Sequence, residues 1–557
     1  MQARRWWVFA LLSIASCGGG ASQGRTSTGS THAGRGQLEV HERFPTRAAI
    51  AALPPPGPIH VDTGIAAGRW EIDPASLAPP SGAVDALYQR LAVDRATAQR
   101  SPPLECVARE TARFYATLHG LPNQSVRRFL AARCGASAVT IGIGVVPAAV
   151  PASRSDENAV LSLGAALADQ LVTATDPSAN RVGLAIHRDG DIFFAGIASS
   201  LVQMEIEPSV PVAVDGHLRL HARVARAPSE LVVMATSGAR GVAECAVSGD
   251  PPELDLDCPF AAGDEYAYVE VMGRDGEAVL CMPLAIALGI ASEGAGLAYT
   301  LRLPSEPTPI GDDLGAAVLP LLNGERALVG ASALALSAEQ SAALARVAPH
   351  AFATDPRVME QAMLYAMAGW ELGDGALVRE GRAIQLMPGA ATDAGEWLFR
   401  ALELPMERWV LLDPEARVIG IGAAAGEGGA VGVASTFRFF EGDEASDRAA
   451  AEAALTEARR AAGHAPPEFV RLEPLEDAAT AIAEEGTDPT EAMNTAVHAL
   501  VRTHSSARGA AYVASVLERI PWSAAALESR HIGIAVRHAH PSGAAWGVYV
   551  IAVVALP

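Results

Sequence analysis

The stretch Arg417–Ser435, "RVIGIGAAAGEGGAVGVAS", decides between a cofactor site and a structural turn. A phosphate-binding loop is followed by a helix whose N-terminus faces the anion. Here the glycines are followed by "VGVASTFRFF", in which β-branched and aromatic residues alternate, as in a strand. The spacing of Gly420, Gly422 and Gly426 also departs from the dinucleotide-binding fingerprint. We therefore predict a β-hairpin here, without a bound phosphate.

The hairpin pattern occurs three times in the 557 residues. Each copy has an arginine, a strand that contains glycine, a turn and a second β-rich strand; the copies begin at Asn180, Ala416 and Ser529. Each is preceded by an amphipathic helix, a break and a second helix rich in Ala and Leu; these segments begin at Val84, Val318 and Ala451. A chain of this length needs several cores, so the pattern predicts repeated α/β domains.

The first seventeen residues, "MQARRWWVFALLSIASC", predict a signal peptide. Two arginines precede an apolar run from Trp6 to Ile14, which is too short to span a membrane. The run ends in a sequence that resembles the bacterial lipobox, which implies cleavage before Cys17 and acylation of its thiol. Gly18 is not the aspartate of inner-membrane retention, so the resemblance favours the outer membrane. An ordinary signal peptide with a chance cysteine is the alternative.

Composition excludes several functions. The net charge is −21, and no basic run interleaved with aromatic residues is present, so nucleic acid binding is not expected. The sequence contains no lysine, and all 42 basic residues are arginine. A Schiff-base lysine and a P-loop lysine are therefore excluded.

Five cysteines remain beyond the lipobox cysteine. In an oxidising compartment, Cys106 with Cys134 and Cys245 with Cys258 are plausible disulfides, which would leave Cys281 as a buried thiol. No C-x-x-C pair exists, so a zinc site made of cysteines is not predicted.

The order of helix, break, helix and closing hairpin resembles the CAP superfamily of cysteine-rich secretory, antigen 5 and pathogenesis-related proteins. The best match covers residues 311–442. There, "LLNGERALVGASALALSAEQSAALARVAPH" is similar to the opening of the bacterial members, with Asn323 and Arg326 at their Asn-x-x-Arg positions. The resemblance implies a three-layer α-β-α sandwich, whose cavity is lined by two histidines and two glutamates that can hold a divalent metal.

The sequence departs from this family at the implied cavity. Glu407 precedes Arg408 where the family has a histidine, and Glu380 lacks the usual Glu-Asn pair. His350 falls in the second helix, away from the implied cavity. We therefore expect that the metal-binding tetrad is not assembled.

Three histidines near the C-terminus are weak candidates for metal ligands. His538 and His540 are two residues apart in "RHAHPSG", and His531 precedes them. A solvated cluster at a turn is the alternative. No G-x-S-x-G motif is present. We predict no catalytic residue, no cofactor and no bound metal.

The predicted fold class is α/β, with repeated α-β-α sandwich (CAP-like) domains and an inserted immunoglobulin-like β-domain, where apolar and polar residues alternate between glycines and prolines. The predicted organisation is a lipoprotein signal peptide (1–17), a flexible linker (18–77), degenerate CAP-like repeat 1 (78–207), the β-sandwich (208–290), CAP-like repeat 2 (311–442) and degenerate CAP-like repeat 3 (446–557).

Two classes of function remain. The first is a non-catalytic, lipid-anchored protein of the cell envelope, at the outer membrane, whose degenerate repeats bind a protein, a lipid or a polysaccharide. The second is a secreted hydrolase or metal-dependent enzyme with a site that the sequence does not identify. The loss of the family's metal-binding residues favours the first class, since function depends on the site rather than on the fold.

Overall fold

The computed structural model describes residues 44–557 except for short segments. These segments are 58, 60–63, 79–81, 92–97, 174–177, 275–279, 293–296, 302–306, 310–312, 373–376, 390–392, 427–428, 441–443, 515–516, 518–519 and 541–543. The predicted signal peptide and Cys17 lie outside the described residues.

Three four-stranded sheets share one strand order. In each, a two-residue strand pairs in parallel with the first strand of a hairpin, and the second hairpin strand pairs antiparallel with an edge strand. In unit 1 (82–200), the strands in spatial order are β2 Gln99–Arg100, β4 Arg181–Asp189, β5 Ile192–Ser200 and β3 Gly142–Ala149. In unit 2 (314–439), they are β15 Ala335–Leu336, β17 Val418–Gly426, β18 Gly429–Phe439 and β16 Val378–Gly389. In unit 3 (444–556), they are β19 Glu468–Phe469, β21 His531–Ala539, β22 Val548–Leu556 and β20 Arg508–Ala514.

The glycine-rich stretch at Arg417 is the β17–β18 hairpin, so that prediction is confirmed. Its glycines allow a helix to approach the sheet closely. A Cβ at Gly422 would lie 2.1 Å from the backbone nitrogen of Ala345, and a Cβ at Gly183 in unit 1 would lie 2.0 Å from the backbone carbon of Leu104. These distances are far inside van der Waals contact, which explains glycine at both positions.

Helices cover both faces of each of these sheets. In unit 1 they are α3 Gly82–Leu91, α4 Pro102–Leu118, α5 Gln124–Arg133 and α6 Asp156–Thr173. In unit 2 they are α7 Leu314–Leu328, α8 Ala338–Ala351, α9 Pro356–Ala368, α10 Ala394–Ala401 and α11 Pro405–Leu411. In unit 3 they are α12 Glu444–Ala461, α13 Glu473–Glu484, α14 Pro489–Val501 and α15 Ala524–Glu528.

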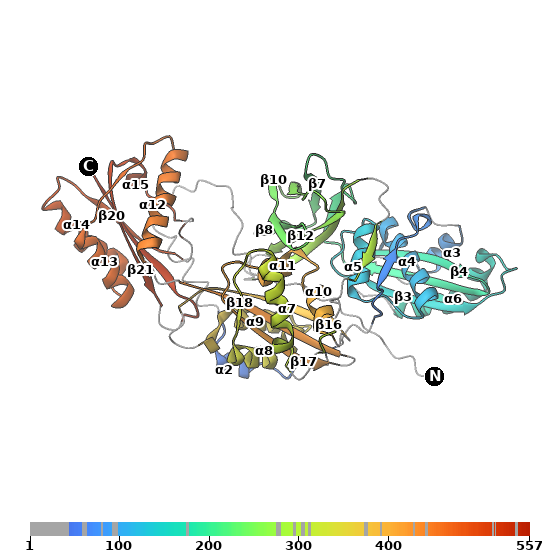
Figure 1. Ribbon diagram of the computed structural model, residues 1–557. Coiled ribbons are helices and arrows are strands. Elements are labelled where there is room, and N and C mark those ends of the chain that lie inside the picture. Colours follow the sequence, from blue (N-terminus) through green and yellow to red (C-terminus); the bar gives the residue numbers. More distant parts are fainter. Residues whose placement is uncertain are drawn as a thin grey trace.

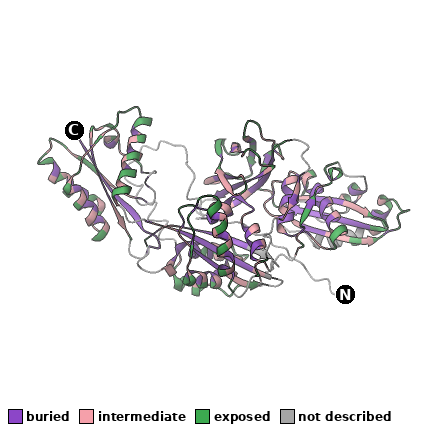
Figure 2. Cartoon of the chain, viewed as in Figure 1, coloured by how far each residue is buried: buried purple, intermediate pink, exposed green. Residues whose placement is uncertain are grey.

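Strand β22 illustrates the layering. Its side chains alternate between the two faces of the sheet: Ile551 packs in one core with α12 and α15, whereas Val550 packs in the other with α13 and α14. Every residue of β22 is therefore buried. Figure 2 shows the same pattern, with buried strands inside and exposed residues on the outer faces of the helices.

A β-sandwich lies between units 1 and 2 along the chain. One sheet is β10 Ala246–Asp250, β11 Glu253–Pro259, β7 His217–Val224 and β6 Met204–Glu207; the other is β13 Met282–Ile290, β12 Tyr266–Arg274, β8 Glu230–Ser237 and β9 Gly241–Glu244. The two sheets contribute to one hydrophobic core. Strand β6 pairs with β7, so this sandwich includes residues before position 208.

Of the predicted flexible linker (18–77), residues 18–43 lie outside the described residues, whereas residues 44–77 contain regular secondary structure. They contain α2 Arg47–Ala51, β1 Arg69–Glu71, which pairs with β14 Ala298–Thr300, and the short helix η1 Pro74–Leu77. Trp70 is buried, and its indole nitrogen donates to Glu110 at 3.0 Å. Phe44 packs against Trp546, with ring centroids 4.8 Å apart. The burial of these aromatic side chains fixes the described residues around them against the folded units.

Both predicted cysteine pairs form disulfides in the structure. Cys106 of α4 is joined to Cys134 at the end of α5, and Cys245 is joined to Cys258 of β11. Cys281 is fully buried, and none of the described cysteines is a free thiol. The expectation of a free thiol at Cys281 is therefore wrong.

The parts form an elongated arrangement (Figure 1). Unit 1 is at one end, unit 3 is at the other with the C-terminus, and the sandwich and unit 2 lie between them. Unit 3 docks on unit 2 through Trp546, whose indole nitrogen donates to the Met367 carbonyl at 3.0 Å. The protein is thus mixed α/β, as predicted, with several small sheets. No helix in the described part of the chain is both long and apolar enough to cross a membrane.

Candidate functional site

The structure does not bring the three candidate histidines together. His531 and His538 lie near opposite ends of β21, about 23 Å apart at 3.3 Å per residue. Nδ1 of His531 is 2.7 Å from the carbonyl oxygen of Pro557, Nε2 of His538 is 2.6 Å from Asp447 Oδ2, and His540 is exposed. Within the described residues, no group of three or more His, Cys, Asp or Glu side chains could hold a metal ion.

Asn323 and Arg326 hold the loop that follows α7. The Asn323 amide forms hydrogen bonds of 2.8 and 3.1 Å with the backbone of Leu334. Arg326 is fully buried and donates to the carbonyls of Ser332, Leu411 and Ala416. Both side chains thus satisfy backbone groups, which gives them a structural role.

Glu380 belongs to an ion-pair network on the sheet of unit 2. It accepts hydrogen bonds from Arg382 at 2.7 Å and Arg438 at 3.2 Å, and both arginines also pair with Asp413. Burial opposes ionisation of Asp413, but hydrogen bonding to Arg438 and the charge of Arg382 hold its pKa below the usual value. The two carboxylates are therefore matched by two guanidinium groups. His350 lies apart from them in the last turn of α8, where burial lowers its pKa.

Glu407 faces the β-sandwich, beside a second buried carboxylate, Glu270 of β12. Glu270 Oε2 accepts the backbone N–H of Met406 at 3.1 Å. Burial, with the nearby charge of Glu407, raises the pKa of Glu270 to about 8. At the same junction, Arg128 of α5 pairs with Glu403 at 3.0 Å. These groups join unit 1, the sandwich and α11, and we assign them to domain docking.

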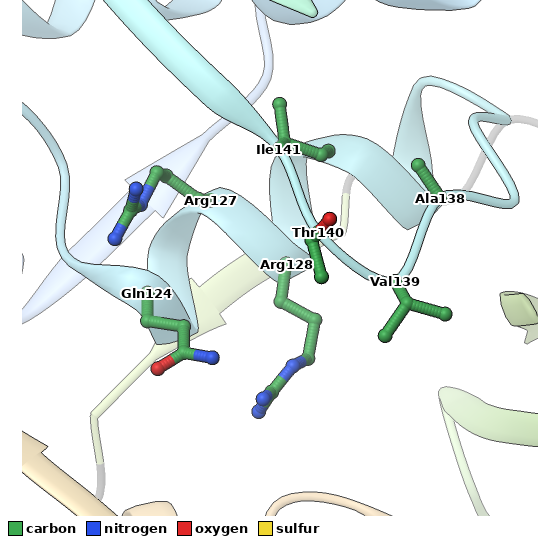
Figure 3. Close-up of a pocket in the computed structure, with 7 residues that line it drawn as sticks. All are labelled: Gln124, Arg127, Arg128, Ala138, Val139, Thr140 and Ile141. Atoms are coloured by element: carbon green, nitrogen blue, oxygen red, sulfur yellow. The ribbon is translucent and has the colours of Figure 1, made fainter. Parts of the chain in front are cut away.

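A small cavity lies beside Arg128 (Figure 3). Figure 3 shows side chains of α5 on one side of it and the segment that leads into β3 on the other. Its volume is about 20 Å³, which is room for about one water molecule and too small for an organic ligand.

A cleft of about 610 Å³ lies in unit 3, where the starts of α12 and α13 meet the end of β21. Its volume falls in the range of sites for small ligands. Six charged residues line it, together with Ala445 and Leu472: Glu444, Arg448, Arg471, Glu473, Glu476 and Arg537.

The acidic groups in the floor of this cleft are already paired. Glu476 forms ion pairs with Arg448 and, at 3.1 Å, with Arg537. Glu444 pairs with Arg537 at 3.2 Å and accepts the backbone N–H of His538 at 3.4 Å. The floor is thus a fixed network that orients its arginines.

The rim of the cleft is different. Arg471 and Glu473 are exposed, and neither side chain pairs with another described residue. Arg448 directs only Nη2 to Glu476, and its buried Nε has no hydrogen-bond partner among the described residues. The cleft therefore has unused donors on two arginines.

Sequence reasoning missed these cleft residues. In the sequence they are charged residues at helix starts, a pattern that usually indicates a solvated surface. No signal in the sequence marks them, because the starts of α12 and α13 and the end of β21 are brought together only by the tertiary fold.

Comparisons with known proteins give little support for a family. No family model matches the sequence, and no curated protein matches it. Among solved structures, the crystal structure of Na-ASP-1, a CAP-family protein, is weakly similar: it has 7% sequence identity and a TM-score of 0.18, over 64% of this chain and 87% of that chain. At this score the likeness defines neither the fold nor the function.

Proposed function

We propose that this protein is a non-catalytic, lipid-anchored component of the cell envelope that binds a hydrophilic partner in the cleft of unit 3. Cys17 would carry the acyl chains and hold the protein at the outer membrane. Units 1, 2 and 3 would be degenerate CAP-like sandwiches, and the β-sandwich an immunoglobulin-like spacer.

The cleft of unit 3 carries this proposal. Its volume suits a small ligand or one end of a polymer, and charged side chains dominate its lining. Burying the acyl chain of a lipid there would remove the unpaired charges of Arg471 and Glu473 from water without compensation, which is unfavourable. Of the three partner classes that the sequence leaves open, protein, lipid and polysaccharide, the charged lining therefore favours a polysaccharide.

The remaining polar centres support a binding role over an enzymatic one. The candidate acids of unit 2 are neutralised by arginines, and Nε2 of His538 is engaged by Asp447. Carboxylates neutralised in this way are poorly placed to act as metal ligands or general bases.

Ala445→Trp tests this function, because Ala445 is exposed and lines the cleft, so the indole would fill it without changing its charge. Ala450→Trp, on an exposed position of the same helix that does not line the cleft, is the matched control. We expect wild-type protein and the control to be retained on isolated envelope polysaccharide, and Ala445→Trp to be released. Equal retention of all three proteins would refute the proposal.

A further inference from the structure

The unused hydrogen-bonding capacity of the unit 3 cleft indicates the chemistry of its ligand. Both floor carboxylates, Glu444 and Glu476, already accept from arginine or backbone donors. In contrast, Arg471 has no partner among the described side chains, and Arg448 keeps donors that Glu476 does not use. The cleft thus lacks an acceptor, and a ligand that supplies one would complete it.

A carboxylate fits this arrangement better than a more highly charged group. Guanidinium groups bind carboxylates and phosphates through paired N–H donors. However, the lining also contains Glu473 at the rim and the two floor glutamates, which balance the three arginines in charge. A carboxylate group places one negative charge against these arginines, whereas a phosphate group would place two at the same point, where the glutamates would repel it.

The size and polarity of the cleft indicate what carries the carboxylate. A lone small anion would occupy only part of about 610 Å³. The unpaired carboxylate of Glu473 offers an acceptor for ligand hydroxyl groups. A hydroxylated ligand with one acidic group per ring meets both requirements.

We infer that the cleft of unit 3 binds a carboxylate-bearing saccharide, and that Arg471 and Arg448 bind its carboxylate. This inference rests on the proposed function and specifies its ligand class. Arg471 is the better residue to test, because it is exposed and its replacement does not disturb the paired network below it.

Isothermal titration of the full-length protein in detergent tests this inference, with trigalacturonate as the probe and its methyl ester and inorganic phosphate as comparisons. We expect trigalacturonate to bind, its methyl ester to bind at least tenfold more weakly, and added salt to weaken binding. Arg471→Glu should weaken trigalacturonate binding at least tenfold and Arg471→Gln several-fold. Arg502→Gln, which neutralises an exposed arginine that does not line the cleft, should stay within twofold of wild type.

Several outcomes would overturn the inference: no binding of trigalacturonate, equal binding of the methyl ester, unchanged affinity in Arg471→Glu, or tighter binding of phosphate. The retention experiment separates this failure from failure of the proposed function. If Ala445→Trp still abolishes retention, the cleft binds a ligand of another class. If it does not, the proposed function fails as well.

Discussion

Arg326 of unit 2 and Arg459 of unit 3 are structurally equivalent. Each is the third residue from the end of the first helix of its unit, is buried, and donates through Nε to the carbonyl six residues ahead. Each also donates to a backbone carbonyl near the start of its hairpin: Arg326 to that of Ala416 and Arg459 to that of Ser529. In both units this carbonyl belongs to the residue that comes two positions before the first hairpin strand. The shared geometry indicates that these arginines tie the first helix to the sheet.

Arg459→Ala should therefore loosen unit 3. It leaves the carbonyls of Ala465, Ala526 and Ser529 without their donor, which we expect to cost about 3 kcal/mol or more. Hydrogen exchange measured by mass spectrometry should show lost protection in β21 and β22, with unit 1 unchanged. Arg460→Gln, at the exposed neighbouring position, should exchange like wild type. Unaltered protection in Arg459→Ala would contradict the structural role.

The buried carboxylate of Glu270 should make stability depend on pH. Its pKa is raised from 4.5 to about 8 by burial and by Glu407, so the folded protein keeps a proton that the unfolded chain has lost between these values. Stability therefore falls as the pH rises through this window, by up to about 1.4 kcal/mol per pH unit. We expect Glu270→Gln to flatten the decline of Tm between pH 5 and 8.

The control for this prediction is Glu265→Gln, which changes an exposed glutamate next to the same strand. Its Tm should decline with pH as in wild type. If Glu270→Gln and wild type have parallel pH profiles, Glu270 is ionised in the folded protein and this account of the junction is wrong.

Gly422→Ala should destabilise unit 2. The new methyl group would lie 2.1 Å from the backbone of α8, so helix and sheet must separate, at a cost of about 2 kcal/mol. Gly324→Ala is the matched control, since Gly324 lies within α7 with nothing within 4 Å of the added Cβ. That change should leave stability equal or raise it by about 0.5–1 kcal/mol. Denaturant titration of both variants checks the expectation, and an equal effect of the two changes would count against close helix–sheet packing.

The disulfide between Cys245 and Cys258 should stabilise the sandwich. It closes a loop over a sequence separation of 13, and for such a loop we expect about 3 kcal/mol. The double change of Cys245 and Cys258 to Ala should lower the first thermal transition and leave β21 and β22 protected from hydrogen exchange. An unchanged transition would show that the bridge adds nothing to the stability of the sandwich.

Much of the secondary structure could be predicted because it follows from local pattern. The β17–β18 hairpin could be predicted because β-branched and aromatic residues alternate after Gly426. The helix pairs could be predicted because their apolar residues recur at helical spacing. The two-residue strands were not predictable, because β15 and β19 owe their conformation to parallel pairing with distant hairpins. Residues 44–77 were misread as linker because Phe44 and Trp70 find their partners far along the chain.

Equivalent residues across repeats were only partly visible. Arg326 was identified by resemblance, but Arg459 was not. One signal was present in the sequence: Arg326 and Arg459 each stand nine residues before a two-residue strand, and Arg90 stands nine residues before Gln99. The cleft of unit 3 could not be predicted, because its lining runs from Glu444 to Arg537 and is assembled only by the tertiary fold.

The central claim is that the protein is lipid-anchored and binds a polar ligand of the cell envelope. Mass spectrometry of the native protein, isolated from outer membranes in mild detergent, tests it most directly. We predict a mature N-terminus at an acylated Cys17 and the co-release of an acidic saccharide. An N-terminus without acyl chains, or a lipid as the released ligand, would contradict the account.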